Sequence, residues 1–333
     1  MTFISILLFF IILNLVLFYR YKLLAKINNI YDIPDNRRKI HKLPVPLIGG
    51  LIIYINIVFF LITNYFFDTK ESILFNNLSE SIIFLFILSA FFFLGRVDDK
   101  NDLSSINKFI LMTIFLIIAI NLDNGILITK LQFSFVEKII HLGNFSYFFT
   151  ILCFLLFINS FNMLDGINGQ AGGYSIYILI IFIFLNINIT LSISLIITLL
   201  FFLYFNFKNK MFLGDSGTIL LGFVFSYFFI KSYNMGFDIS SDEIFLIMMI
   251  PGFELLRLAL QRLYNKRHPF SPDNQHIHHL LLRKLSFFKT YFLIQSLLLF
   301  PYLFYLLIEN SLISLVVSST IYSIIIFYFS KKK

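Results

Sequence analysis

The sequence has few charged residues and a single cysteine. Only 13% of its 333 residues are Asp, Glu, Lys or Arg, whereas 59% are hydrophobic. A soluble domain of this length has no interior large enough to bury so much apolar surface, so lipid must be part of its solvent. The single cysteine, Cys153, excludes a disulfide within the chain, and the spacing typical of a zinc finger is absent.

Windows of about 20 apolar residues, the length of one bilayer crossing, predict eleven helices. They lie near residues 2–20, 47–66, 80–96, 106–122, 146–162, 171–187, 190–206, 217–232, 243–261, 290–308 and 311–329. The first window lacks a basic N-terminal region and a small-residue cleavage site, which favours a retained transmembrane helix over a signal peptide. We therefore expect an all-α integral membrane protein, a single polytopic domain over residues 1–333. The stretch ILITKLQFSF, between the fourth and fifth windows, alternates enough to predict a small β-hairpin.

Positive charge is distributed unevenly over the connections between these windows. Of the 26 Lys and Arg residues, 22 fall in one set: connections 20–46, 96–108, 207–216 and 257–289, and the tail after 329. The positive-inside rule places this set in the cytoplasm, with the N-terminus outside and the C-terminus inside. The net charge of +8 therefore indicates orientation rather than nucleic-acid binding, because no basic stripe stands clear of the apolar segments.

Five polar motifs lie on this predicted cytoplasmic side, and the first two carry opposite charges. DIPDNRRKIHKLPVPLIGG, at residues 32–50, concentrates basic residues that include Lys42, and is either an orientation anchor or an anion clamp. GRVDDKNDLSS, at residues 95–105, places Asp98 and Asp99 directly after an apolar helix. Such a pair is either a solvated helix end or a site for a hard cation such as Mg²⁺, because adjacent carboxylates repel each other unless a cation or a shared proton compensates.

The third and fourth motifs combine polar side chains with glycine-rich turns. In NSFNMLDGINGQAGG, at residues 159–173, a polar stripe of Asn159, Asn162 and Asp165 ends an otherwise apolar helix. Polar residues at such depth usually face a partner or a cavity, although helix capping is the alternative. In NKMFLGDSGTILLGF, at residues 209–223, Asp215 meets the start of a helix, where a simple N-cap is also an adequate explanation.

The fifth motif, HPFSPDNQHIHHLLLRK at residues 268–284, contains four of the six histidines. Zinc binding is one interpretation, but if the segment is helical only His276 and His279 share a face, and His278 points away. Hydrogen bonding and charge donation to a phosphate fit better, because the motif is flanked by basic residues, which are Arg267, Arg283 and Lys284.

Five motifs on one membrane face predict a joint site that holds a divalent cation, phosphates and a nucleotide, as phosphoryl transfer at a membrane surface requires. The motifs, in this order, resemble those of the polyprenyl-phosphate N-acetylhexosamine-1-phosphate transferases, which are glycosyltransferase 4 proteins of the MraY and WecA types. The form PFSPDNQHIHH is closer to the WecA branch. The resemblance covers residues 32–284 and implies a bacterial inner-membrane enzyme. Its site would be formed by cytoplasmic loops 20–46, 96–108, 162–171, 207–216 and 262–289.

This resemblance also implies a reaction, in which undecaprenyl phosphate attacks a UDP-N-acetylhexosamine, UMP leaves, and an undecaprenyl-diphosphate sugar remains. Asp215 would be the leading ligand of Mg²⁺, with Mn²⁺ as an alternative. Asp98 and Asp99 would act on the lipid phosphate and share the metal. The nucleotide would be bound by Asp165, Asn162 and Phe212, while Lys42 and the histidines His276, His278 and His279 would hold sugar or diphosphate. Asn159 and Arg267 complete the predicted substrate-binding set.

One position departs from the family pattern. Many relatives read DGxDG, whereas this chain has Asn168 in DGING, so a charge is replaced by an amide and the role of this residue in substrate binding is open. Two other functions are compatible with parts of the sequence: a secondary transporter of an anionic solute, although transporter sites usually lie near the bilayer midplane, and an inactive scaffold. A homodimer is also compatible with the sequence.

Overall fold

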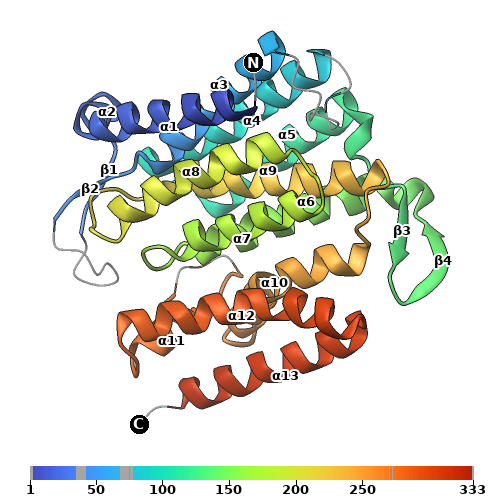
Figure 1. Ribbon diagram of the computed structural model, residues 1–333. Helices are drawn as coiled ribbons and strands as arrows, with labels where there is room; N and C mark the ends of the chain where they lie inside the picture. Colours follow the sequence, from blue (N-terminus) through green and yellow to red (C-terminus); the bar gives the residue numbers. More distant parts are fainter. Residues whose placement is uncertain are drawn as a thin grey trace.

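A computed structural model describes residues 3–34, 43–67, 75, 78–269, 271 and 273–331 (Figure 1). The helices before the hairpin are α1 (Phe3–Tyr19), α2 (Tyr21–Asn28), α3 (Gly49–Phe67), α4 (Leu78–Asn101), α5 (Ser105–Leu122) and the short η1 (Asn124–Ile126). Those after it are η2 (Gly143–Phe145), α6 (Ser146–Leu164), α7 (Gln170–Phe184), α8 (Ile189–Asn206), α9 (Gly214–Asn234), α10 (Ser241–Tyr264), α11 (Ile277–Leu282), α12 (Phe287–Ile308) and α13 (Ser311–Ser330).

Each of the eleven windows predicted from hydropathy overlaps one helix of the structure. Among the described residues, eight helices are long and apolar enough to cross a membrane, and the bent pair α1–α2 would make nine. Helix α7, with 15 residues, and helix α10 are not among these eight. The protein is thus a mostly helical, multi-pass membrane protein, while a count of eleven crossings stays a prediction.

Two small antiparallel sheets lie at opposite ends of the helices. Strands β1 (Tyr31–Asp32) and β2 (Val45–Pro46) pair at the end that also carries α11 and the C-terminus (Figure 1). Strands β3 (Lys130–Phe133) and β4 (Val136–His141) form the hairpin at the other end. The predicted hairpin is therefore present, although its second strand begins just after the stretch that predicted it. The phenol of Tyr233 anchors it by accepting a hydrogen bond from the Gln132 N–H.

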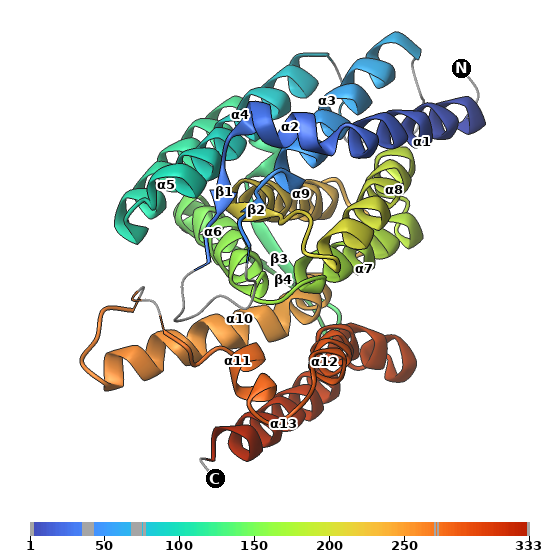
Figure 2. The same cartoon turned by 90° about the vertical axis from the view of Figure 1, so that its left-hand side faces the viewer.

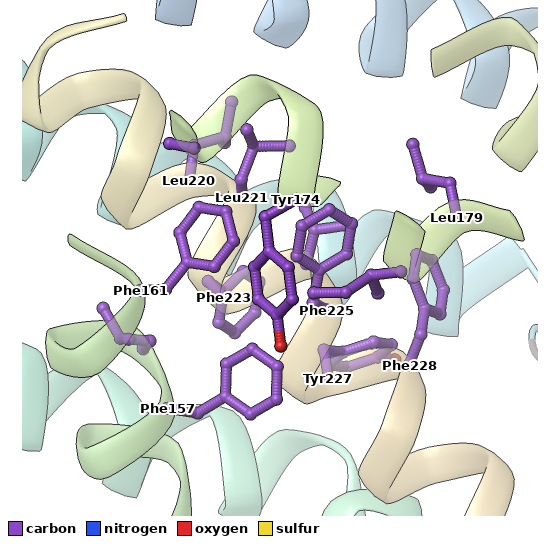
Figure 3. Close-up of a cluster of buried hydrophobic side chains, with 14 of the residues drawn as sticks. Phe157, Phe161, Tyr174, Leu179, Leu220, Leu221, Phe223, Phe225, Tyr227 and Phe228 are labelled. Carbon is purple, nitrogen blue, oxygen red and sulfur yellow. The ribbon is translucent and has the colours of Figure 1, made fainter. Parts of the chain in front are cut away.

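Helix α9 is the centre of the fold. It is buried from Ser216 to Tyr233 and packs against α3, α4 and α6. Figure 3 shows the aromatic cluster around it, in which Phe161 of α6 and Tyr174 of α7 lie beside Phe223 and Phe225. In lipid, helix association depends on close packing, because the lipid tails are as apolar as the side chains. A central helix with neighbours on all sides gives the largest contact area.

Buried polar groups add specific contacts between the helices. Asn14 of α1 and Asn56 of α3 exchange side-chain hydrogen bonds of 2.9 and 3.2 Å, and Asn14 also donates to Thr198 of α8. At the hairpin end of α9, the ammonium of Lys231 lies 2.8 Å from both Glu80 and Asp123. These groups satisfy one another, which avoids the large cost of an unpaired polar group in an apolar medium.

Candidate active site

The carboxylate motifs of α4 and α9 meet because the two helices approach closely. A Cβ atom built on Gly95 of α4 would lie 2.4 Å from the Cα of Ser216. Only glycine allows this approach, since any side chain would collide with the α9 backbone. The approach brings the adjacent carboxylates at the C-terminal end of α4 to the N-terminus of α9.

Asp99 caps α9 from another helix. Its carboxylate accepts hydrogen bonds from the N–H groups of Asp215 at 2.7 Å and Ser216 at 3.0 Å. The first N–H groups of a helix have no partner within the helix and favour a negative charge. Asp99 supplies both the acceptor and the charge. The alternative explanation for Asp215, a simple N-cap of its own helix, is therefore wrong, and the Asp215 side chain is available for other contacts.

Those contacts are made with α5 and α6. Asp215 accepts a hydrogen bond of 2.5 Å from the side-chain amide of Asn162, which also donates to Thr218 at 2.7 Å. The ammonium of Lys108 forms an ion pair with Asp98 and lies 3.6 Å from the other oxygen of Asp215. Asp98, Asp99, Asp215 and Lys108 are called the carboxylate cluster below.

Lys108 is a residue that the motifs did not reveal. A signal was present, because Lys108 is the only charged residue of α5, an otherwise apolar helix. A cation in that position compensates the repulsion between Asp98 and Asp215.

The carboxylate cluster matches a hard divalent cation in the chemistry of its donors. Carboxylate oxygens are the ligands that Mg²⁺ prefers, and the cluster already needs a positive charge between Asp98 and Asp215. Within the described part of the chain, however, no three His, Cys, Asp or Glu side chains are arranged as a ready metal site. Asp99 is engaged by two N–H groups, although a carboxylate has about four lone-pair positions and keeps room for a further contact.

Asp165 lies at the C-terminal end of α6, close enough for its charge to interact with Asp215 and Asp99. Solvent reaches the Asp165 side chain. Desolvation by the surrounding protein raises the pKa of Asp165, and the negative charges of Asp215 and Asp99 raise it further. The surroundings of Asp165 already disfavour additional negative charge, so they favour a bound cation or a phosphate-binding group at this position.

The histidine motif packs directly against the turn that follows Asp165. A Cβ atom on Gly166 would lie 1.9 Å from the Cε1 atom of His278, so the imidazole covers the bare backbone of this glycine. His278 is only 5% exposed. The third and fifth motifs are thus in contact.

The three neighbouring histidines form one group. Their ring centroids are separated by 5.4 Å for His276 and His278, 4.3 Å for His278 and His279, and 6.3 Å for His276 and His279. The prediction that His278 points away from the other two is wrong. That prediction assumed a helix through all three residues, but α11 begins at Ile277 and His276 precedes it with extended backbone.

Burial makes two of these rings poor sources of charge. It lowers the pKa of His278 well below its ordinary value, and the neighbouring histidines lower it further. Burial also lowers the pKa of His276. At neutral pH these two imidazoles are therefore uncharged and can contribute hydrogen bonds, but not the positive charge expected of them.

The described residues of 268–283, called the histidine loop below, are held on α10 by three side chains that the sequence did not reveal, namely Glu254, Arg257 and Arg262. The carboxylate of Glu254 accepts hydrogen bonds from Arg257, from the Tyr322 hydroxyl at 2.5 Å and from the Ile277 N–H at 2.7 Å. Arg257 also donates to the Gln275 carbonyl at 2.7 Å.

An ion pair joins the loop to α10 near the C-terminal end of that helix. Arg262 lies 2.6 Å from Asp273 and donates to the Pro269 carbonyl at 2.7 Å. None of the three α10 charges belongs to a recognisable motif, and each of them contacts a backbone group of the loop.

The remaining predicted residues occupy varied positions. Asn159 donates to the Leu155 carbonyl of its own helix. Asn168 donates to Asn209, which joins the DGING turn to the connection between α8 and α9. Phe212 is part of a backbone bridge to Leu47, beside β2. The exposed Arg267 follows the end of α10, and Lys42 lies outside the described residues.

The fold and the carboxylate cluster define a multi-pass membrane protein with an acidic, solvent-accessible site at the ends of its helices. The model of glycosyl transferase family 4 matches residues 81–233, the segment that contains the carboxylate cluster, Asn162 and Asp165. The resemblance suggested by the motifs is thereby confirmed, and the chain is similar to this family over that segment.

Curated relatives make the resemblance more specific. Over 288 residues, the chain is 28% identical to the undecaprenyl-phosphate alpha-N-acetylglucosaminyl 1-phosphate transferase of Escherichia coli (strain K12), a match that covers 82% of this chain and 74% of the relative. The undecaprenyl-phosphate alpha-N-acetylglucosaminyl 1-phosphate transferase of Yersinia pestis is 28% identical, over 74% of this chain and 68% of the relative. The probable undecaprenyl-phosphate N-acetylglucosaminyl 1-phosphate transferase of Bacillus subtilis (strain 168) is 26% identical, over 75% of this chain and 69% of the relative.

Proposed function

We propose that this protein transfers N-acetylhexosamine 1-phosphate from a UDP-sugar to undecaprenyl phosphate. The products are UMP and undecaprenyl-diphosphate-N-acetylhexosamine, the starting lipid of a cell-envelope glycan. The observation that carries the proposal is the meeting of α4, α5, α6 and α9 in one carboxylate cluster, beside Asp165 and the histidine loop. The names of the curated relatives support the same reaction and give no support to a transporter.

The chemistry requires one bond to form and one to break. An oxygen of the lipid phosphate attacks the sugar-bearing phosphorus of the UDP-sugar, and the bond from that phosphorus to the bridging oxygen breaks as UMP leaves. The attacking phosphate is already anionic near neutral pH, because the second pKa of a phosphomonoester is about 6. The main tasks of the protein are therefore to align the two phosphates and to stabilise negative charge.

The carboxylate cluster would hold the cation that this charge requires. Asp215 and Asp98, with Asp99 behind them, would bind Mg²⁺, or Mn²⁺ in its place, and the bound ion would neutralise the diphosphate of the UDP-sugar. Lys108 lies between the same carboxylates and would orient them.

The neighbouring groups would bind the rest of the substrate. Asp165 and Phe212 would contact the nucleotide, while Asn162, which donates to Asp215, would position that carboxylate. The histidine group and Arg267 would contact sugar and phosphate, with Arg267 supplying positive charge. Asn159 and Asn168 make only intramolecular contacts with Leu155 and Asn209, which gives their binding roles less support.

We further propose that the site faces the cytoplasm of a bacterial inner membrane. The support is the concentration of Lys and Arg in the connections at the end of the molecule that carries the carboxylate cluster. Under this proposal the eleven helices cross the membrane as one domain, and the predicted loops 20–46, 96–108, 162–171, 207–216 and 262–289 surround the site.

The test is UMP release from UDP-N-acetylhexosamine by purified protein with undecaprenyl phosphate and Mg²⁺. Asp215→Asn and Asp99→Asn should each abolish this activity, because each removes a charge from the carboxylate cluster. Asp102→Asn is the matched control, since Asp102 is exposed beyond the end of α4 and its left-handed backbone suits asparagine. Full activity in both cluster variants would refute the assignment of the metal site. Uptake of a solute into proteoliposomes without UMP release would refute the transferase.

A further inference from the structure

An apolar groove lies between α1 and α8, on the outer surface of the helical bundle. Figures 1 and 2 both place these helices side by side. The groove has a volume of about 540 Å³, within the range of about 300–1,000 Å³ that is typical of ligand sites. Its lining comes from Leu15, Phe18 and Tyr19 of α1 and from four residues of α8.

The floor and the walls of this groove differ in exposure. Phe18 is buried and forms the floor together with Phe201 and Phe205, whose ring centroids lie 5.5 and 5.4 Å from its own. The walls include Leu200 and Tyr204 of α8, which are 56% and 58% exposed. The groove is therefore open on its outer side and offers an acyl chain a mostly apolar surface.

Three cations stand at one end of this groove. The ammonium of Lys208 lies 3.8 Å from the centroid of the Tyr204 ring, and that of Lys210 lies 5.8 Å from the Phe205 ring. The guanidinium of Arg20 lies 5.9 Å from the Tyr19 ring. Contacts between a cation and an aromatic face hold these charges beside the lining residues.

None of the ion pairs in the described part of the chain involves these three cations. Among the described residues, the ion pairs involve only the basic residues Lys108, Lys231, Arg257 and Arg262. The end of the groove thus combines unneutralised positive charge with an apolar channel. This combination is complementary to a molecule that has an anionic head and a long apolar tail.

We propose that the groove binds an anionic glycerophospholipid, with one acyl chain between α1 and α8 and its phosphate among Arg20, Lys208 and Lys210. Basic groups at the ends of membrane helices recognise such headgroups, each cation strengthening the attraction. The lining of the groove comes from α1 and α8, which contribute no residue to the carboxylate cluster. The three cations lie in connections 20–46 and 207–216, which also border the proposed active site.

The experiment is native mass spectrometry of the purified full-length protein in detergent, titrated separately with phosphatidylglycerol and phosphatidylcholine. The unmodified protein should retain one phosphatidylglycerol more tightly than phosphatidylcholine. Lys208→Gln with Lys210→Gln should weaken this binding by about 25-fold, roughly fivefold for each cation. The control pair, Lys289→Gln with Lys331→Gln, removes the same charge away from the groove and should change the binding by less than about twofold.

A second variant tests the groove without changing its charge. Leu200→Trp fills part of the channel at an exposed position and should weaken phosphatidylglycerol binding while leaving the thermal unfolding temperature unchanged. Equal retention of the two lipids, or undiminished phosphatidylglycerol binding in both the lysine pair variant and Leu200→Trp, would overturn the proposal. So would a dimer that covers the groove and carries no lipid.

Discussion

Replacement of Glu254 by glutamine should release the histidine loop from α10. Glu254 is 4% exposed and accepts hydrogen bonds from Arg257, Tyr322 and the Ile277 N–H. Glutamine has nearly the same shape but no charge. Its NH₂ group, which is a donor, would replace a carboxylate oxygen that now accepts hydrogen bonds. The guanidinium of Arg257 would then be left without its anion.

The size of the effect follows from the burial of this pair. Removal of one partner from a buried ion pair costs about 3–5 kcal/mol. The Arg257 side chain is 19% exposed, so water recovers part of this loss and we expect about 3 kcal/mol. Glu254 and Arg257 both lie on α10, so the attachment of the loop depends on the hydrogen bond from the Ile277 N–H to Glu254. A hydrogen bond to a charged group contributes about 1.5–3 kcal/mol, which corresponds to a shift of about 10- to 100-fold in the equilibrium between the attached and the released loop. UMP release should fall, because the loop carries the three clustered histidines.

Limited trypsin digestion measures the release directly. Lys266 and Arg267 are exposed in the loop region, and cleavage there should accelerate in Glu254→Gln under conditions where the rest of the protein stays folded. The control is Arg283→Gln, which removes one exposed hydrogen bond to the Asn274 carbonyl and should change cleavage little. Unchanged cleavage and unchanged UMP release in Glu254→Gln would refute the anchoring role.

Three further predictions concern the contacts around the candidate active site. Gly166→Ala should reduce UMP release at least about tenfold, because the added methyl group displaces His278. The control is Gly252→Ala, where a Cβ meets no neighbour, and it should leave UMP release unchanged. Equal activities of the two variants would contradict the packing argument. Lys108→Gln should lower the unfolding temperature by a few degrees, which corresponds to a loss of about 1–2 kcal/mol in the free energy of unfolding. Mg²⁺ should stabilise this variant more than the unmodified protein, because Asp98 and Asp215 have lost their cation. An identical response of the two proteins to Mg²⁺ would contradict this. Since the folded-state pKa of His278 lies below its unfolded value, its contribution is complete above about pH 6.5 and is lost as the pH falls below it, at up to about 1.4 kcal/mol per pH unit. His278→Gln should therefore show a shallower loss of stability between about pH 6.5 and pH 5 in thermal unfolding, and parallel curves would exclude this origin.

The sequence alone located the helices and identified most of the candidate site. Hydropathy is a local property, so windows of apolar residues were enough to place eleven helices without knowledge of their neighbours. The candidate carboxylates could also be identified from the sequence alone, because charged residues are unusual in an apolar chain. The distribution of Lys and Arg likewise divided the connections into two sets. In the structure, sheet β1–β2 belongs to a connection of one set and sheet β3–β4 to a connection of the other, and the two sheets lie at opposite ends of the molecule.

Only the tertiary structure decided what these residues do to one another. Asp99 caps α9 because Gly95 lets two helices approach, and no spacing within either segment contains that relation. Lys108 looked like an ordinary basic residue near a membrane end until α5 placed it between two carboxylates. The hydrogen bond that anchors the histidine loop on Glu254 joins residues 23 positions apart, because its donor is the backbone N–H of Ile277. A backbone N–H is common to nearly every residue, so contacts of this kind leave no trace in the sequence and arise only when the helices pack.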